Sequence, residues 1–347
     1  MEISIQKSNQ LKSIAILMML CLHLFNRPFQ GLFVPVLFIG NQPLSYYISL
    51  FCDACVPIFA FVSGYGLFYK FKEAKSEYWK GNKTRIRNLY INYWIILFLF
   101  VLLLGSVLGK VDYIGDISTF FMNFTALNTS YNGAWWFMTI YLLFVITSSF
   151  WFQLLLKWTL IFYLSVLLVL YILGFYFRIY NGSLSTSIFI KWLYVQSALY
   201  FCTLFQFMLG AFTLHYRWHS KISIVVQTLP FKNYLLVLAI VALVVLHGLV
   251  PNFFIAPFIG LVFILIYCQM DIPLFFQKII DFFTPHATNI WLIHMFFYLI
   301  YFPNLIYAPK HPVLIFFWLV LWCLAASYLV NSIQRVVMSC LNKKIRF

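Results

Sequence analysis

Charged residues are scarce in this sequence. Lys, Arg, Asp and Glu together make up only 9% of its 347 residues, and Asp and Glu number 8. A soluble domain carries roughly 25% charged and about 45–50% apolar residues, whereas 64% of the residues here are hydrophobic and 22% are aromatic. A soluble fold of this length cannot bury so much apolar surface, so the sequence predicts a polytopic membrane protein.

Signals for metal and nucleic-acid binding are also weak. The seven cysteines include one Cys-x-x-Cys pair, Cys52 and Cys55, but no second Cys/His pair is placed to complete a zinc site. The formal net charge of +15 comes from basic residues in short segments between apolar runs, not from one patch. This distribution is better explained by membrane topology than by a nucleic-acid-binding surface. We therefore expect neither a metal nor a nucleic-acid partner.

Long apolar runs fill the chain instead. About 20 apolar residues are needed for a transmembrane helix, and the sequence predicts an all-α bundle of about ten such helices. They lie near residues 12–34, 44–69, 88–109, 134–156, 158–177, 188–214, 233–250, 252–270, 286–306 and 312–338. Only Pro251 and Asn252 separate the seventh and eighth spans, so a single re-entrant element there, with nine spans in total, is the alternative.

The basic residues predict the orientation of these spans. If the N-terminus is cytoplasmic, about 18 of the 23 Lys and Arg residues fall on the inner side and about 5 on the outer. Most of the excess lies between spans two and three, from Lys70 to Arg87. We therefore expect both termini to be cytoplasmic. The first residues do not resemble a cleaved signal peptide, and we expect residues 1–347 to form a single membrane domain.

Four ionisable residues lie inside or at the edge of spans, where such residues are rare and often functional. Lys12 and His23 are eleven residues apart in the first span, which is about 16 Å along a helix. If Lys12 is at the inner surface, then His23 lies near mid-membrane. Asp53 in the second span is about 12–14 Å from the outer surface, and His294 in the ninth is about 12 Å from the inner one. The three side chains are thus predicted to share one layer.

Simpler interpretations of these residues remain open. A single intramembrane histidine can be a hydrogen-bond partner between helices without any catalytic role. Asp53 could line a water-filled vestibule or pair with Arg27. Lys12 could be an anchor whose ammonium reaches the interface.

Several motifs follow one another along the chain. Lys12 and His23 form a basic-x10-His pattern, and "VPIFAFVSGYGLFYKF" carries Ser63, Gly64 and Tyr65 after a Phe-rich run. The later segments are "KTRIRNLYINYW" with Arg85, Arg87 and Asn92, "GAWWFMTIYLLF" with Trp135 and Trp136, "FQFMLGAFTLHYRW" around Gly210, and "NIWLIHMFF" with Trp291 and His294. In this order, they resemble the integral membrane acyltransferase 3 family, of the stand-alone type. The family usually carries proline where this chain has Asn92.

The resemblance implies a reaction and roles for these residues. The family transfers an acyl group, usually acetyl, from cytoplasmic acyl-CoA to a hydroxyl, often of a cell-envelope sugar. Lys12, Arg85 and Arg87 would bind the phosphates of the donor. His23 would act as general base or carry the acyl group covalently. Acetyl-CoA would be a co-substrate, and no bound cofactor is expected.

The remaining candidates would orient groups or hold the acceptor. Asp53 would orient the His23 ring by accepting its other N–H. His294 and the pair Trp135 and Trp136 would hold the acceptor or the developing oxyanion, and Ser63 is a further acceptor-binding candidate. The implied location is a bacterial plasma membrane, with lipids and an envelope polysaccharide or lipid-linked sugar as partners.

A different class of function competes with this one. His23, Asp53 and His294 could form a proton relay in a transporter or flippase of lipid-linked sugars. Such transporters often contain internal repeats, and the two halves of this sequence show no symmetry.

Overall fold

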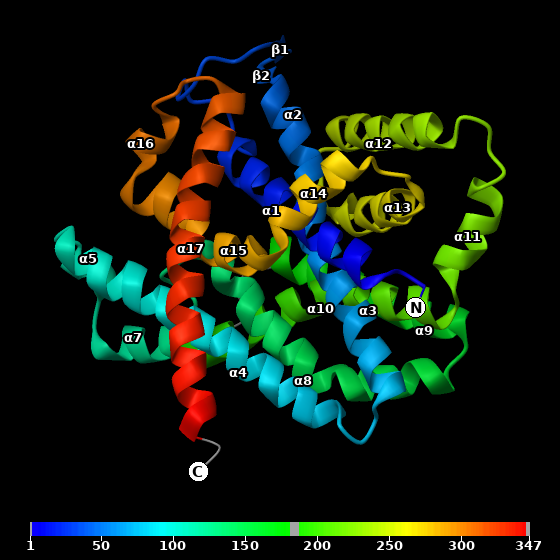
Figure 1. Cartoon of the computed structure of the whole chain (residues 1–347), viewed down its shortest axis with the longest axis horizontal. Helices are drawn as coiled ribbons and strands as arrows, with labels where there is room; N and C mark the ends of the chain where they lie inside the picture. The colour runs from blue at the N-terminus through cyan, green and yellow to red at the C-terminus, as the bar shows by residue number, and fades with distance from the viewer. Residues whose placement is uncertain (1, 181–186, 345–347) are drawn as a thin grey trace. The chain divides into compact units, whose positions relative to one another are not determined.

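The computed structural model describes residues 2–180 and 187–344, which are almost entirely helical (Figure 1). The predicted all-α membrane fold is confirmed, because eight described helices are long and apolar enough to cross a membrane. The only strands in the described part are a two-residue antiparallel pair, β1 (Phe38–Ile39) and β2 (Gln42–Pro43). Residues 181–186, between the fifth and sixth predicted spans, fall outside the described residues.

The chain divides into two compact units. The first consists of Met1–Asn26, Tyr46–Tyr78 and Ile140–Thr284. It holds α1 (Ile5–Phe25), α3 (Cys55–Glu73), α9 (Leu160–Ile179), α10 (Ile188–His215), α11 (Trp218–Val226), α12 (Lys232–Leu249), α13 (Ala256–Gln269), α14 (Leu274–Phe282), and most of α2 (Leu44–Phe51) and α8 (Trp136–Lys157).

The second unit consists of Arg27–Ser45, Trp79–Thr139 and Pro285–Phe347. Besides the strand pair, it holds nearly all of α4 (Tyr78–Ile96), α5 (Leu104–Val107), α6 (Val111–Ile114), α7 (Ile117–Phe124), α15 (Ala287–Met295), α16 (Pro303–Tyr307) and α17 (Pro312–Lys344). A π-helical stretch, Leu97–Leu103, joins α4 to α5 without a break.

Two of the ten predicted spans are shorter than the others. The eighth is α13 (Ala256–Gln269), which is 14 residues long. It is separate from α12 but packs beside it. The ninth is α15 followed by a π-helical stretch, Phe296–Tyr301. Pro303 cannot extend a helix, because it lacks an amide hydrogen and its ring clashes with the preceding turn, so α16 starts anew there. Hydropathy detects the apolar run but not this interruption.

The closest helix packing in the first unit is between α3 and α10. A Cβ atom on Gly64 would overlap the backbone carbonyl of Phe207, and one on Gly210 would overlap that of Phe61. Each glycine therefore allows the two backbones to touch, as small residues commonly do between membrane helices. This explains the glycines in two of the sequence motifs.

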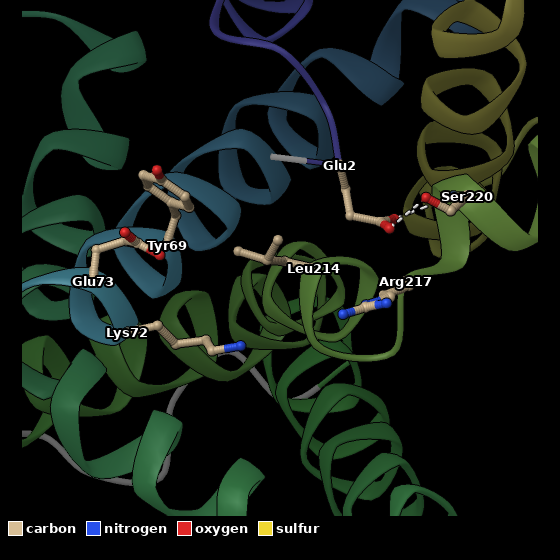
Figure 2. A pocket seen from close by; sticks show the side chains of 7 residues that line it. All are labelled: Glu2, Tyr69, Lys72, Glu73, Leu214, Arg217 and Ser220. Carbon is tan, nitrogen blue, oxygen red and sulfur yellow. Dashed lines mark hydrogen bonds between the residues drawn. The ribbon is translucent and has the colours of Figure 1, made fainter.

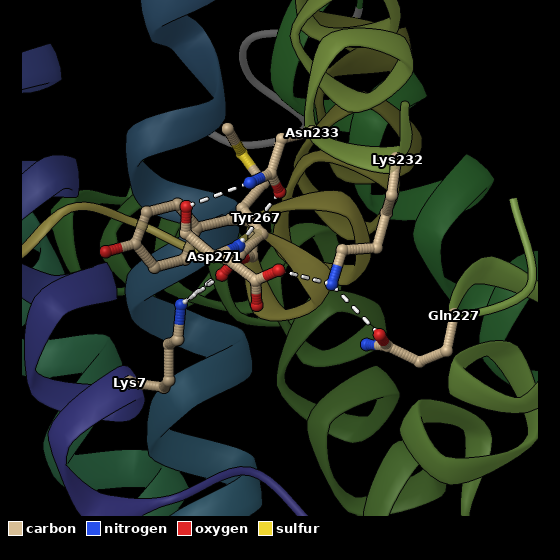
Figure 3. Close-up of polar contacts among 7 residues, drawn as sticks. Lys7, Gln227, Lys232, Asn233, Tyr267 and Asp271 are labelled. Carbon is tan, nitrogen blue, oxygen red and sulfur yellow. Dashed lines mark hydrogen bonds and ion pairs between the residues drawn. The ribbon is translucent and has the colours of Figure 1, made fainter. Parts of the chain in front are cut away.

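Polar contacts gather several helix ends at one end of the first unit (Figure 3). Lys7 Nζ donates to the Met270 carbonyl at 3.0 Å, and Lys232 Nζ lies 2.6 Å from Asp271 Oδ2. The backbone N–H of Ile3 donates to Tyr65 Oη at 2.7 Å. The starts of α1 and α12, the end of α13 and the second half of α3 thus lie together at this end, as the predicted alternation of spans requires. Which side of the membrane this end faces remains a prediction.

Candidate functional site

Lys12 and His23 lie on one uninterrupted helix, α1. Its start is capped by Ser4, whose Oγ accepts from the Lys7 N–H at 3.1 Å. Eleven residues correspond to roughly three turns of 3.6 residues, so Lys12 and His23 share a face of α1 about 16 Å apart. Both residues are half-buried, and His23 is in the last turn. The predicted spacing of cation and imidazole is therefore built into a single rigid element.

Asp53 lies at a break between two helices. The segment Cys52–Ala54 is a 3-10 turn between α2 and α3. Pro57 follows four residues after Asp53 and has no N–H to offer its carbonyl, which accounts for the break. The carboxylate accepts from Asn26 Nδ2 at 3.4 Å, and Asn26 caps the end of α1 one turn beyond His23. Asp53 and the end of α1 are thus brought together in the first unit.

His247, which the sequence analysis missed, is a second neighbour of Asp53. Its Nε2 lies 3.8 Å from Asp53 Oδ2, within ion-pair distance but too long for a hydrogen bond. The His247 side chain is fully buried, although most of α12 is exposed on the protein surface. Only Leu236 and His247 are buried on this helix. The side of α12 that carries His247 therefore faces Asp53.

Ser63 in α3 uses its hydroxyl within its own helix. Ser63 Oγ donates to the Phe59 carbonyl at 2.8 Å, and the residue is half-buried. The hydroxyl keeps its lone pairs for a further donor. Its role in binding the acceptor stays a prediction.

His294 in the second unit is fully buried and held by its own helix. Its Nδ1 is 2.8 Å from the Trp291 carbonyl and 3.2 Å from that of Ile290. Carbonyl oxygens only accept, so Nδ1 must carry the hydrogen. In the neutral ring, Nε2 then has the lone pair, which is the form needed to accept a proton or a hydroxyl hydrogen bond.

Trp135 is bonded to the same helix. Its Nε1 donates to the Leu292 carbonyl at 2.8 Å, and Asn132 Nδ2 donates to that carbonyl at 3.1 Å. The carbonyl is available because the N–H of Phe296, where the π-helical stretch begins, bonds to Ile293 and His294 instead. The Trp135 and Asn132 side chains therefore supply the hydrogen bonds that the Leu292 carbonyl loses where the helix type changes. They also hold the segment that contains Trp135 against the helix of His294.

The two tryptophans differ in accessibility. Trp135 is 0% exposed, with ring centroids of Tyr93 at 4.7 Å and Phe296 at 5.7 Å. Trp136 is half-buried. Packing has already covered Trp135, so Trp136 is the member of the pair with surface left for a sugar ring.

Arg85 and Arg87 lie in the middle of α4. Arg85 is half-buried and its Nη1 donates to Asn82 Oδ1 at 2.9 Å, whereas Arg87 is exposed. Residues two apart point to different sides of a helix. The two guanidinium groups therefore leave α4 in different directions, and Asn82 orients only Arg85.

A buried polar network surrounds Asn92, where the family usually has proline. Asn92 Nδ2 donates to Asn289 Oδ1, and Asn289 Nδ2 donates to Ser327 Oγ at 3.0 Å and to Asn331 Oδ1 at 2.8 Å. His286 Nδ1 lies 2.9 Å from Ser327 Oγ. The asparagine thus joins α4 to α15 and α17 by hydrogen bonds that proline could not make. The departure from the motif at Asn92 is the one signal of this network in the sequence.

The described residues contain no group of three or more His, Cys, Asp or Glu side chains that could hold a metal ion. Cys52 and Cys55 are buried, free thiols.

Comparison with known proteins agrees with the motifs. The acyltransferase domain profile of the acyltransferase 3 family matches residues 5–332, nearly the whole chain. No curated protein and no solved structure matches significantly. Apolar helices long enough to cross a membrane, the Lys12–His23 helix and this match together lead to one assignment: the chain belongs to the acyltransferase 3 family of membrane acyltransferases.

Proposed function

We propose that this membrane acyltransferase moves an acetyl group from cytoplasmic acetyl-CoA to a hydroxyl of a cell-envelope sugar, such as an exopolysaccharide or capsule unit. The observation that carries the proposal is the placement of Lys12 and His23 on one face of α1, about 16 Å apart. A phosphate-bearing donor with an extended arm fits such a pair, because one end needs a cation and the other needs a base.

The donor phosphates are assigned to Lys12, Arg85 and Arg87. Phosphate oxygens form strong charge-assisted hydrogen bonds with ammonium and guanidinium groups. The bond from Arg85 to Asn82 favours Arg85 as the better oriented of the two arginines.

His23 accepts the proton of the acceptor hydroxyl as the hydroxyl oxygen attacks the thioester carbonyl carbon. The new C–O bond forms, the C–S bond breaks, and the proton passes to the departing thiolate to give free CoA. A covalent acyl-His23 is the other possible route. His294 holds the acceptor or the oxyanion, with Trp136 and Ser63 as acceptor contacts.

Incubation of the purified protein with radiolabelled acetyl-CoA and envelope polysaccharide tests the function. Label should move to the polysaccharide as an alkali-labile ester. Free CoA should appear in the same amount. A transporter or flippase would neither transfer the label nor release CoA, and that outcome would favour the proton-relay alternative.

Lys12→Gln should raise the KM for acetyl-CoA by about tenfold, because a hydrogen bond to a charged group contributes roughly 1.5–3 kcal/mol and 1.4 kcal/mol is tenfold. The kcat should fall less, since Lys12 is about 16 Å from the reacting centre. Lys12→Arg should stay close to wild type. Lys70→Gln, an exposed cation on α3, is the control. Equal KM values for Lys12→Gln and wild type would remove Lys12 from donor binding.

Asp53→Asn and His247→Gln should each lower kcat about tenfold, and the double variant should be little worse than either. The reason is that two groups 3.8 Å apart act as a unit, so their effects are not additive. Asp271→Asn, at the opposite end of the first unit and largely exposed, is the matched control. Kinetics of the four proteins measure the coupling, and additive losses would mean that Asp53 and His247 act separately.

A further inference from the structure

A cavity of about 420 Å³ lies at the end of the first unit that holds the N-terminus (Figure 2). Three parts of the chain line it: Glu2 (three residues before α1), the last turn of α3, and the junction between α10 and α11. Tyr69, Leu214 and Ser220 supply its uncharged surface. The volume is within the range of about 300–1,000 Å³ typical of small-molecule sites.

Two cations line this cavity, one from α3 and one from the turn between α10 and α11. Lys72 belongs to the last turn of α3, and Arg217 immediately precedes α11 (Figure 2). Among the described residues, neither lies within 4.0 Å of a carboxylate oxygen. Both side chains are exposed. An anionic group bound in the cavity could therefore be contacted from two sides without breaking an existing ion pair.

Two carboxylates balance these charges. Glu2 is fixed by Ser220, whose backbone N–H donates to Oε2 at 3.2 Å and whose hydroxyl donates to Oε1 at 2.6 Å. Glu73 also lines the cavity and is exposed. The cavity thus has two positive and two negative groups. A polyanion such as CoA would gain two cations but face two carboxylates, whereas a zwitterion can pair with both signs.

The position of the cavity identifies the source of such a zwitterion. Lys72 and Leu214 are in the final turns of α3 and α10, where two apolar spans end. Lipid headgroups occupy this level of a bilayer, and basic pockets between transmembrane helices bind them. Tyr69 is an interfacial aromatic residue of the kind found at that level.

We propose that this cavity binds the headgroup of a zwitterionic, amine-bearing phospholipid of the phosphatidylethanolamine class. Lys72 and Arg217 contact the phosphodiester, and Glu73 contacts the ammonium group. The site is separate from Lys12 and His23 in its residues, and it does not depend on the proposed acyl transfer.

Native mass spectrometry of the detergent-purified full chain tests this. Phosphatidylethanolamine and phosphatidylglycerol with identical acyl chains are added in equal amounts. Wild type should retain the ethanolamine lipid preferentially. Lys72→Ala and Arg217→Ala should each reduce that bound fraction about tenfold, while Lys70→Ala, two residues away and not lining the cavity, should not. Glu73→Gln should abolish the preference between the two lipids.

Thermal unfolding of each variant verifies that it is folded, as expected for exposed positions. Unchanged ethanolamine-lipid binding in folded Lys72→Ala and Arg217→Ala would overturn the proposal. A wild-type preference for phosphatidylglycerol would also overturn it. Displacement of the lipid by free CoA or inorganic phosphate would instead assign the cavity to a soluble phosphate ligand and refute the lipid headgroup.

Discussion

His23→Ala is expected to abolish acetyl transfer while the protein still inserts and folds. A positioned general base contributes about 10²–10⁴-fold to a rate, so the loss should be about a thousandfold. The same loss or more is expected if His23 carries the acyl group. Insertion should persist, because alanine removes a polar side chain from membrane depth, where such groups are costly. Transfer of label from acetyl-CoA, at equal amounts of purified protein, measures the effect.

The matched control is His311→Ala, which removes an exposed histidine and should leave the rate unchanged. His23→Gln keeps a hydrogen-bonding side chain but cannot accept a proton at neutral pH, so it should be as inactive as alanine. Acid-quenched wild type that carries label on His23 would select the covalent route. Transfer by His23→Ala near the wild-type rate would remove His23 from the mechanism.

Gly64→Val or Gly210→Val should prevent the accumulation of folded protein. In both cases, the atom that a new Cβ would meet belongs to the backbone of the facing helix, Phe207 or Phe61, and cannot move aside as a flexible side chain can. Overpacking a core usually costs about 1–3 kcal/mol, and forcing α3 away from α10 should exceed that. Fluorescence-detected size-exclusion chromatography of detergent extracts should show aggregate in place of the monodisperse peak.

Gly66→Ala provides the control on the same helix. A Cβ at Gly66 would have no neighbour within 4 Å, so this variant should elute and unfold like wild type. If Gly64→Val were equally well behaved, the contact between the α3 and α10 backbones would be unnecessary for folding.

The helical membrane fold followed directly from the sequence, because apolar runs of about 20 residues have few alternatives in a bilayer. The interruptions of the helices could not be predicted in this way. The 3-10 turn at Asp53 and the π-helical stretch after Met295 both lie within continuous apolar runs. Their positions depend on prolines and on carbonyl partners elsewhere in the fold, which hydropathy does not report.

The same distinction applies to the candidate site. The Lys12–His23 spacing was predictable, since helix geometry alone relates two positions on one element. His247 was missed because its burial depends on which side α12 turns to its neighbours. Trp135 was predicted, with Trp136, to hold the acceptor or the oxyanion. The motif could not show that its side chain is fully buried and donates to the Leu292 carbonyl. Whether such side chains are buried depends on tertiary contacts, which helix geometry alone does not give.

Because α1 carries both Lys12 and His23, the helix sets a constant distance between the group that binds the donor phosphates and the group that meets its thioester. Tilting the helix moves the ammonium and the imidazole together, so thermal motion hardly changes their separation. A donor with a much shorter arm between its phosphates and its acyl group cannot contact Lys12 and His23 at the same time. Donor choice would then depend on molecular length, even among thioesters of equal chemical reactivity.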